Sequence, residues 1–541
     1  MSIIIAISNV AAKLVNADQT AVSIVSDCLS YDVESAKYTA GFKMGTWNGK
    51  KTFLKYPDLV FEAGFVPMVK QALTDAGIPV SVHDKRVPVE IRADEIALNG
   101  IELRDYQIRA IEILEREKRG VLQVATGGGK TEIAIAATRR FGLKTLFLTH
   151  KLDLVRQTRK RYHDRLGTHA GQISEGEWMP AEITVATVQT IMAHWTKIWT
   201  VRGSKLDGAK LEHVETTARG MTESDARRYA KKTLKMVSID HIEMKEDMTE
   251  KVRTFLHSIE FLIVDEAHRA SGNSFFKIVQ ECKNAYYRCG LTATPLMKGN
   301  REDDLKLIAQ TGDVIYRITN NDLIQLGILA QPRFRFVQVD KFPTPGGVYP
   351  GKLDYHPIYR IGIVENEERN KLVVRETRSL VMEGRQTVVL VKEIKHGNIL
   401  YEMMRKNGLK VEWVAGKDNA DKRDAALNRL RTGEINVLIA STILDEGLDC
   451  DAISGIVLAG GGKSKIALFQ RVGRSVRKKK GDTLAKIGNT ARIVDFIDTG
   501  DIRLYRHSGE RFRSVHTEPG WIIDSIESIA NRESAQLEIA V

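Results

Sequence analysis

The chain of 541 residues has few cysteines and no long apolar segment. Its four cysteines show no CxxC spacing and are too few for a disulfide framework, so we expect neither disulfides nor a structural zinc site; they are Cys28, Cys282, Cys289 and Cys450. No run of about 18 apolar residues occurs, and the apolar start MSIIIAISNVAAKL lacks the basic segment of a secretory signal. The sequence therefore predicts a soluble, cytoplasmic protein that makes no contact with a membrane.

What the chain does have is length, apolar content and positive charge. Its length exceeds what one hydrophobic core can serve, and a hydrophobic content of 43% is sufficient for several domains. The net charge of +12 favours a polyanionic partner, and nucleic acid fits this better than a membrane surface.

A glycine-rich stretch, VLQVATGGGKTEIAIAATRR from Val121 to Arg140, is the first candidate site. An apolar run, three glycines, Lys130 and Thr131, and then a helix-like segment are typical of a strand, a phosphate-binding loop and a helix. Glycine allows backbone N–H groups to face phosphate oxygens, Lys130 supplies a positive charge and Thr131 a hydroxyl for Mg²⁺. Because Val124 occupies the place of the outer glycine in GxxxxGK[ST], a glycine turn without special chemistry is the alternative for this stretch alone.

A pair of acidic residues follows a second apolar run, in FLIVDEAHRA from Phe261 to Ala270. A buried strand there delivers Asp265 and Glu266 at its carboxyl end, where open α/β sheets bind ligands. Asp265 is suited to hold Mg²⁺, and Glu266 to orient or deprotonate the attacking water. A solvated acidic pair is the alternative, which the phosphate-binding loop in the same chain disfavours.

The order of these motifs resembles that of superfamily 2 helicases of the DEAH-box type. VATGGGKT, VDEAH and LTATP resemble motifs I, II and III, and three later segments resemble motifs IV, V and VI: VVLVKE (388–393), ASTILDEGLDC (440–450) and QRVGRSVRKKK (470–480). The resemblance covers residues from about 96 to 508. It implies an α/β fold with two tandem RecA-like parallel-sheet domains, which bind ATP and Mg²⁺ in the cleft between them.

Carried over by position, the resemblance also implies roles for individual residues. Nucleotide binding falls to Gln107, Thr126, Gly127, Gly128, Gly129, Lys130, Thr131, Gly447 and Asp449, and Mg²⁺ to Thr131 and Asp265. The catalytic set is Glu266, Lys130, Gln470 and the candidate arginine fingers Arg474 and Arg477, and the coupling set is His268, Thr292 and Thr294. Nucleic-acid contacts fall to His150, Lys151, Thr187, Gln189 and Thr442. A finger arginine stabilises the phosphoryl-transfer transition state only when its domain is closed, which couples hydrolysis to movement.

The domains predicted from these patterns are a small N-terminal α+β module (1–95), a first RecA-like domain (96–335), a second one (336–508) and a C-terminal tail (509–541). In the module, Asn48-Gly49 predicts a two-residue hairpin that presents Trp47, Lys50 and Lys51. These residues suit contact with nucleic acid, and a packing role for Trp47 is an equal alternative. We expect removal of residues 1–95 to leave basal ATP hydrolysis largely intact.

Two further segments are less informative. A charged insertion (about 196–255) contains ESDARRYAKKTLK, which predicts a helix with one basic side; its residues are Arg227, Arg228, Lys231, Lys232 and Lys235. It is either a solvated helical insertion or a basic arm that grips phosphates. In the tail, PGWIIDSIESIANRES predicts a helix of unknown role.

Among the family's branches, the chain looks most like phage UvsW-type DNA helicases, with more distant similarity to XPB-type and RecG-type translocases. That similarity implies a DNA partner and remodelling of branched DNA: forks, Holliday junctions and R-loops. An RNA helicase is the alternative, disfavoured because the sequence lacks the DEAD spelling and the SAT form of motif III. A degenerate, non-hydrolysing module is disfavoured by the complete set of catalytic residues, and no nuclease constellation accompanies the motor.

Overall fold

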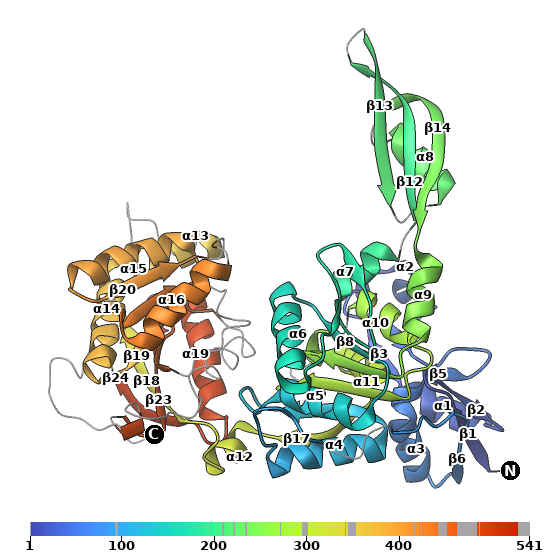
Figure 1. Cartoon of the computed structure of the whole chain (residues 1–541), viewed down its shortest axis with the longest axis horizontal. Coiled ribbons are helices and arrows are strands. Elements are labelled where there is room, and N and C mark those ends of the chain that lie inside the picture. The colour runs from blue at the N-terminus through green and yellow to red at the C-terminus, as the bar shows by residue number, and fades with distance from the viewer. Residues whose placement is uncertain are drawn as a thin grey trace. The chain divides into compact units, whose positions relative to one another are not determined.

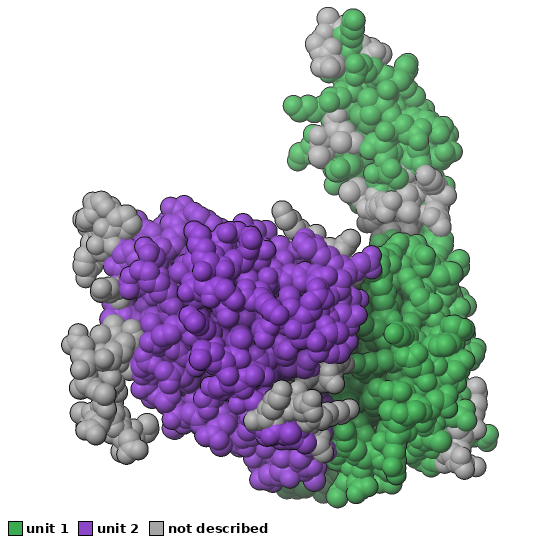
Figure 2. Space-filling model, turned by 60° about the vertical axis from the view of Figure 1, so that its left-hand side comes forward, with its two compact units in different colours: residues 1–124, 129–317 green, residues 125–128, 318–541 purple. Residues whose placement is uncertain are grey.

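The computed structural model describes residues 2–91, 96–195, 197–207, 210–219, 222–232, 235–270, 272–294, 301–340, 342–343, 353–415, 418, 420–441, 452–462, 484–485 and 487–527. The chain forms two compact units (Figure 2). Unit 1 contains residues 1–124 and 129–317, and unit 2 contains residues 125–128 and 318–541. The division near residue 317 falls before β18 (Gln331–Val339), whereas the sequence-based boundary at 335/336 falls within that strand. No helix among the described residues is long and apolar enough to cross a bilayer.

Unit 1 is built on an eight-stranded sheet (Figure 1). Its strands in spatial order are β10 (Glu177–Met179), β9 (Gly171–Ser174), β11 (Ile183–Thr187), β8 (Thr145–Thr149), β15 (Phe261–Asp265), β16 (Tyr287–Thr292), β7 (Arg119–Val124) and β17 (Val314–Ile318). The strands from β9 to β7 pair in parallel, and β10 pairs with β9 in the antiparallel sense. The central strands β8 and β15 are buried along their whole length, as expected where helices cover both faces of a parallel sheet.

Side chains of β15 alternate between two layers of helices. Leu262 and Val264 join the apolar core that contains α7 (Val188–His194), α9 (Thr249–His257) and α10 (Asn273–Glu281). Phe261 points to the other layer, where its ring packs edge-on against Phe141 of α5 (Lys130–Phe141). The helices α4 (Asp105–Glu117) and α6 (Leu152–Leu166) complete the domain. This doubly wound arrangement confirms the predicted α/β parallel-sheet fold.

The N-terminal module is a small α+β domain, as predicted. Its sheet has the order β5 (Val60–Glu62), β2 (Ala11–Val15), β1 (Ile3–Ile7) and β6 (Val80–Asp84), with helices α1 (Gln19–Cys28) and α3 (Val66–Asp75). A separate pair of strands joins β3 (Ser30–Asp32) to β4 (Lys50–Thr52), and a short 3₁₀ turn, Ala36–Tyr38, and helix α2 (Ala40–Lys43) lie between them in the chain.

The hairpin predicted at Asn48-Gly49 is wrong. Strand β4 pairs with β3, which lies well before α2 in the chain, and not with the residues directly before Asn48. A type I′ turn needs positive φ at both central residues, but only Gly49 has it (φ 80°). Position 49 requires glycine for its positive φ and also for lack of space, because a Cβ there would lie 2.9 Å from the ring of Phe42 on α2.

The module shares its core with the first RecA-like domain. Leu305, Ile308 and Ala309 of α11 (Arg301–Thr311) belong to the same apolar cluster as the strands and helices of the module. The guanidinium of Arg301 donates hydrogen bonds to the carbonyl oxygens of Cys28 (2.7 Å) and Ser30 (2.8 Å). Residues 1–91 are therefore packed into unit 1, and the module covers much of this apolar face of α11.

The charged insertion is mainly a β-structure, so a purely helical reading of it is wrong. Strands β12 (Lys197–Asp207), β13 (Lys210–Arg219) and β14 (Met236–Asp247) form an antiparallel sheet in the order β13-β12-β14 (Figure 1). The predicted helix exists as α8 (Glu223–Lys232), which packs through Ala226 and Ala230 on Val201, and Lys235 lies beyond its end. We call residues 197–247 the insertion arm.

Unit 2 is a seven-stranded parallel sheet. Its order is β20 (Val411–Val414), β21 (Val437–Ala440), β19 (Gln386–Leu390), β22 (Ile453–Val457), β23 (Thr490–Asp498), β18 and β24 (Ile522–Glu527). Its longer helices are α14 (Glu367–Met382), α15 (Ile394–Lys406), α16 (Ala420–Thr432) and α19 (Ile502–His516). This is the second parallel-sheet domain that the resemblance implied.

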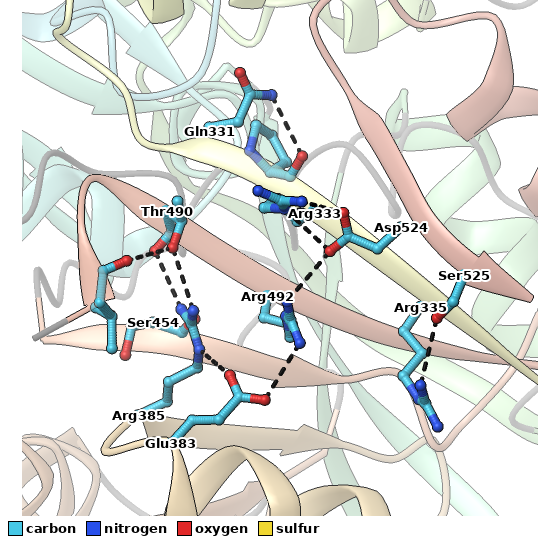
Figure 3. Close-up of polar contacts among 12 residues, drawn as sticks. Gln331, Arg333, Arg335, Glu383, Arg385, Ser454, Thr490, Arg492, Asp524 and Ser525 are labelled. Atoms are coloured by element: carbon cyan, nitrogen blue, oxygen red, sulfur yellow. Dashed lines mark hydrogen bonds and ion pairs between the residues drawn. The ribbon is translucent and has the colours of Figure 1, made fainter.

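The helix predicted in the C-terminal tail is wrong over residues 522–527, which form the edge strand β24 beside β18. Asp524 receives two close contacts from the guanidinium of Arg333 on β18 (2.6 and 2.9 Å) and one from Arg492 on β23 (3.4 Å), as Figure 3 shows. These cross-strand ion pairs and the isoleucines of β24 favour a strand. The segment is part of the sheet, and α19 crosses the 508/509 boundary.

Truncation tests whether the module is separable. Deleting residues 1–95 exposes the apolar face of α11, so we expect a lower melting temperature for the remaining chain. In the full chain, Leu305→Ala should lower the free energy of unfolding by about 2–5 kcal/mol. The matched control, Leu326→Ala, removes an exposed leucine and should change it by less than about 0.5 kcal/mol. Unaltered melting of the truncated chain would contradict the shared core.

A buried histidine in unit 2 predicts a pH dependence of stability. His396 is fully buried and hydrogen-bonded through Nε2 to Asn370 Oδ1 (2.9 Å). Burial, followed by the charge of Arg369, lowers its pKa from 6.5 to about 3. Below pH 6.5 the unfolded chain binds a proton here that the folded chain does not, so stability should fall as pH decreases from 6.5, by up to about 2 kcal/mol at pH 5.

The variant His396→Gln should flatten this pH dependence, measured by urea denaturation between pH 5 and 7.5. The control is His516→Gln, which replaces an exposed histidine in the same unit. Parallel pH profiles for wild type and His396→Gln would show that this histidine is not the responsible group.

Candidate active site

The carboxyl ends of neighbouring parallel strands bring together motifs that are far apart in the sequence. β15 pairs with β16 and β8, and β16 pairs with β7, all in parallel, so these strands end at the same edge of the unit 1 sheet. The edge therefore carries the glycine loop after β7, Asp265 and Glu266 at the end of β15, and Thr292 at the end of β16. This is the ligand-binding edge of an open α/β sheet.

The glycine loop turns through left-handed backbone conformations. Gly127 has φ 85° and Gly129 has φ 82°, which a residue with a Cβ adopts only with strain. Gly129 is the N-cap of α5, so Lys130 and Thr131 are the first residues of a 12-residue helix whose free N–H groups and dipole favour an anion. A side chain at Gly129 would collide with the carboxamide of Gln107, which is buried directly beside the loop.

Gln107 lies where the sequence placed it, close to the loop. Its Oε1 accepts a hydrogen bond from the backbone N–H of Arg104 (3.0 Å), which fixes the start of α4 and the orientation of the carboxamide. The predicted nucleotide residues Gln107, Gly129, Lys130 and Thr131 thus come together in unit 1.

A chain of polar contacts links the loop to β16. The Nζ of Lys130 lies 3.8 Å from Glu266 Oε1, and the other carboxylate oxygen of Glu266 lies 3.4 Å from His268 Nδ1. His268 Nδ1 is also hydrogen-bonded to Thr292 Oγ1 (3.0 Å), which accepts from the backbone N–H of Thr294 (3.1 Å). Of the predicted coupling residues, His268 therefore contacts the predicted catalytic carboxylate directly, and Thr292 and Thr294 are linked to it through His268.

The chain reverses sharply at Glu266, which has φ 47° although it is not a glycine. Such a conformation costs on the order of 1–3 kcal/mol and persists only where the surroundings enforce it. It turns the backbone directly after Asp265, so that two adjacent carboxylates project from the end of one buried strand.

The two carboxylates have opposite electrostatic character. Burial, followed by repulsion from Glu266, raises the pKa of Asp265 to about 6. Burial also acts to raise the pKa of Glu266, but the combined electrostatic effects of Lys130, His268, His150 and Arg269 lower it overall. Glu266 is therefore ionised at neutral pH, as a group that accepts a proton from water must be.

These residues fit a nucleotide with Mg²⁺. The left-handed glycines and the start of α5 form a phosphate-binding turn, and Lys130 is a compact cation beside it. The Asp265 carboxylate and the Thr131 hydroxyl are the hard oxygen ligands that Mg²⁺ prefers. The raised pKa of Asp265 reflects buried negative charge that a cation would compensate.

Four of the predicted nucleic-acid residues lie at the adjacent edge formed by β8 and β11. His150 and Lys151 follow β8, and Thr187 ends β11. Gln189 Nε2 donates a hydrogen bond to the carbonyl oxygen of His150 (3.2 Å), which ties the two loops together. Thr187 is buried and its hydroxyl accepts from the backbone N–H of Thr190 (3.3 Å), so it caps α7.

Trp47, Lys50 and Lys51 lie on a different element, the β3–β4 region of the module. The indole N–H of Trp47 donates to the carbonyl oxygen of Lys50 (2.7 Å), and the ring is half-buried, so Trp47 packs locally.

In the insertion arm, Arg227 pairs with Glu223 (2.8 Å) and Arg228 with Asp225 (3.5 Å). These pairs favour the solvated interpretation of α8.

The remaining predicted site residues lie outside the described residues. They are Thr442, Gly447, Asp449, Gln470, Arg474 and Arg477. Within the described residues, no group of three or more His, Cys, Asp or Glu side chains could hold a metal ion.

Sequence reasoning missed two neighbours of the catalytic carboxylates. Arg269 contributes to lowering the pKa of Glu266, and His150 is also close enough to act on both carboxylates. Burial, followed by Arg269, lowers the pKa of His150 to about 4, so this histidine is neutral at pH 7. Arg269 stands three residues after Glu266 in the motif, but the closeness of His150 depends on β8 pairing with β15, which no local pattern reveals.

Two family models match the chain. The model described as "Type III restriction enzyme, res subunit" matches residues 100–297, and the model described as "Helicase conserved C-terminal domain" matches residues 368–479. The first match contains Lys130, Asp265 and Thr292, and the second covers most of the β19–β23 region.

Three relatives illustrate what the chain is similar to. "Putative helicase 22" of Sulfolobus islandicus filamentous virus is 24% identical over 433 residues, 76% of this chain and 68% of that protein. "DNA 3'-5' translocase XPB2" of Sulfurisphaera tokodaii is 24% identical over 444 residues, 76% and 85% of the two chains. "ATP-dependent DNA helicase uvsW" of Enterobacteria phage T4 is 22% identical over 262 residues, 48% and 50%. The crystal structure of T4 UvsW aligns with 97% of this chain and 99% of its own, with a TM-score of 0.43 and 16% identity.

Proposed function

Since the chain belongs to the superfamily 2 helicases, as its motifs indicated, we propose that it is an ATP-dependent DNA helicase that unwinds or remodels branched DNA. The proposed substrates are forks, Holliday junctions and R-loops in replication, recombination or repair. Support for DNA comes from the relatives, two of which are named as a DNA translocase and a DNA helicase. Two relatives come from a virus and a phage, which supports a phage protein acting in the host cytoplasm.

The observation that carries the enzymatic part is the contact chain from Lys130 through Glu266 and His268 to Thr292. Bound Mg-ATP supplies the phosphoryl group and a divalent charge. Lys130 and the N–H groups at the start of α5 hold phosphate oxygens, and Thr131 and Asp265 offer oxygen ligands to Mg²⁺. The ionised Glu266 orients a water molecule and accepts its proton.

His268 connects this site to strand β16. It contacts both Glu266 and Thr292, so a change in the charge of Glu266 alters the hydrogen bond to the end of β16. The proposed roles of Gln107, Thr126, Gly127 and Gly128 in nucleotide binding rest on the motif positions. The proposed roles of six further residues also rest on the motif positions: Thr442, Gly447, Asp449, Gln470 and the finger arginines Arg474 and Arg477. The two arginines would make hydrolysis depend on closure of the two domains.

An ATP-dependent RNA helicase is the alternative function, because the same site would serve either nucleic acid. We expect ATP hydrolysis to be stimulated by DNA and most strongly by a four-way junction. The measurement compares turnover without polynucleotide and with single-stranded DNA, duplex DNA, the junction and RNA, at two salt concentrations. Stimulation by RNA alone would replace the DNA proposal by the alternative, and equal stimulation by linear duplex and junction would remove the preference for branches.

Substitutions at the site test the assigned chemistry. Glu266→Gln keeps the shape of the side chain but removes the base, and should lower kcat at least about 100-fold. Lys130→Ala removes charge at the phosphates and should lower turnover by a similar or larger factor. Matched controls are Glu281→Gln, which removes another carboxylate paired with a histidine, and Lys283→Ala. Wild-type turnover in either site variant, measured with DNA present, would refute the assignment.

A further inference from the structure

One segment of the N-terminal module combines positive charge with aromatic rings and contains no acidic residue. Residues 35–57 hold five lysines and five aromatic residues but no aspartate or glutamate. The lysines are Lys37, Lys43, Lys50, Lys51 and Lys55, and the aromatic residues are Tyr38, Phe42, Trp47, Phe53 and Tyr56. Such a mixture is what binding of single-stranded nucleic acid requires: cations for phosphates and ring faces for bases.

The structure packs the first part of this segment, up to the start of β4, into one local element, whereas Phe53 and Leu54 belong to the core of the module. The ring of Phe42 on α2 lies against Gly49, directly before β4, and Trp47 lies beside Gly41 of the same helix. The indole N–H of Trp47 holds the carbonyl oxygen of Lys50, which fixes the loop to the start of β4. Helix α2, the preceding turn with Tyr38 and the start of β4 are therefore packed together, and we call residues 37–51 the aromatic–lysine patch.

The exposed aromatic side chains of the patch are Tyr38 and Phe42, and not Trp47, the aromatic residue that the sequence suggested. Tyr38 is 72% exposed, Met44 70% and Phe42 42%, whereas Trp47 is half-buried and serves the fold. The ammonium group of Lys37 lies 5.2 Å from the centroid of the Tyr38 ring. Tyr38 is thus the most open ring of the patch, with a cation directly beside it.

The lysines of the patch are available to an anion. In the part of the chain that the structure describes, no ion pair within 4 Å involves Lys37, Lys43, Lys50 or Lys51, whereas Lys55 is paired with Glu62 (2.6 Å). The nearest carboxylate in the β3–β4 ladder is Asp32, opposite Lys50. Residues 37–51 contain these four lysines and no aspartate or glutamate, so the patch itself is positively charged.

We propose that the aromatic–lysine patch binds single-stranded DNA, with a base stacked on Tyr38 and backbone phosphates on Lys37, Lys43, Lys50 and Lys51. A single strand fits better than a duplex, because exposed rings gain from stacking only on bases whose faces are open, and a duplex hides those faces. This proposal rests on the proposed function for the choice of DNA. It assigns to the module the unpaired strand that branched DNA contains.

The patch is connected to the motor through a short path. Strand β4 pairs with β3, and the carbonyl oxygens of Ser30 in β3 and of Cys28 at the end of α1 accept hydrogen bonds from Arg301 at the start of α11. Helix α11 follows the Thr292–Thr294 segment in the chain and packs into the core of unit 1. A strand held by the patch is therefore anchored to the domain that carries Lys130 and Glu266.

The test uses the full-length protein and two probes of equal length, a fluorescein-labelled oligo-dT of 20 nucleotides and a blunt 20-base-pair duplex. Fluorescence anisotropy without nucleotide gives Kd for each. Tyr38→Ala should weaken binding of oligo-dT at least about 5-fold, the lower end for loss of one base–aromatic stack, with less than a twofold change for the duplex. Tyr38→Phe, which keeps the ring, should bind like wild type.

Charge variants test the phosphate contacts. Lys43→Gln and Lys51→Gln should each reduce the slope of log Kd against log salt by about 0.7 for the single strand. Matched controls outside the patch are Lys70→Gln on α3 and Tyr505→Ala on α19, a half-exposed ring in unit 2. Both should bind oligo-dT like wild type.

Defined outcomes separate this inference from the proposed function. If DNA stimulates the wild-type ATPase but Tyr38→Ala binds oligo-dT normally, or loses single strand and duplex equally, the patch proposal is wrong and the DNA helicase proposal stands. If a 20-nucleotide oligo-rU binds tightly, oligo-dT does not, and only RNA stimulates turnover, the choice of DNA fails. A selective loss on oligo-dT that Tyr38→Phe restores supports the proposal.

Discussion

The arrangement of positive charge around Glu266 is the interaction on which the rest of the site depends. Asp265 and Glu266 are adjacent carboxylates at the end of one buried strand, so they disfavour each other's ionisation. The surrounding groups, Lys130 foremost, offset this for Glu266, whose pKa is lowered, while that of Asp265 is raised. This difference suits the proposed roles of Glu266 as a base and of Asp265 as a ligand of Mg²⁺. Both roles require the glycine loop, β15 and β16 to end at one sheet edge.

The N-terminal module extends this rigid unit. Its apolar core includes α11, and Arg301 ties its β3 strand to the start of that helix. The module and the first parallel-sheet domain are thus joined through packed side chains and hydrogen bonds. The insertion arm differs in that its sheet and α8 have a small core of their own, and arginines of α8 pair with carboxylates of the same helix.

Local pattern was reliable where neighbouring residues decide the structure. The strand–loop–helix at Val121–Arg140 and the buried strand before Asp265 were predicted because apolar runs, glycines and caps act over a few residues. Local pattern gave wrong predictions where a segment pairs with residues that are distant in the sequence. Asn48-Gly49 forms no hairpin because β4 pairs with β3 beyond α2, and residues 522–527 form a strand because Arg333 and Arg492 meet Asp524 across the sheet.

The sequence by itself determined the family and the α/β fold class, and it indicated the residues proposed for the nucleotide site, because that chemistry demands particular residue types at short spacings. Only the tertiary structure decided which motifs are neighbours. The order β8-β15-β16-β7 brings His150 to the catalytic carboxylates and His268 to Thr292. Packing against Gly41 turns Trp47 into a structural residue and leaves Tyr38 exposed. Sheet order and side-chain exposure arise from contacts between distant segments, and the period of a local pattern carries no information about them.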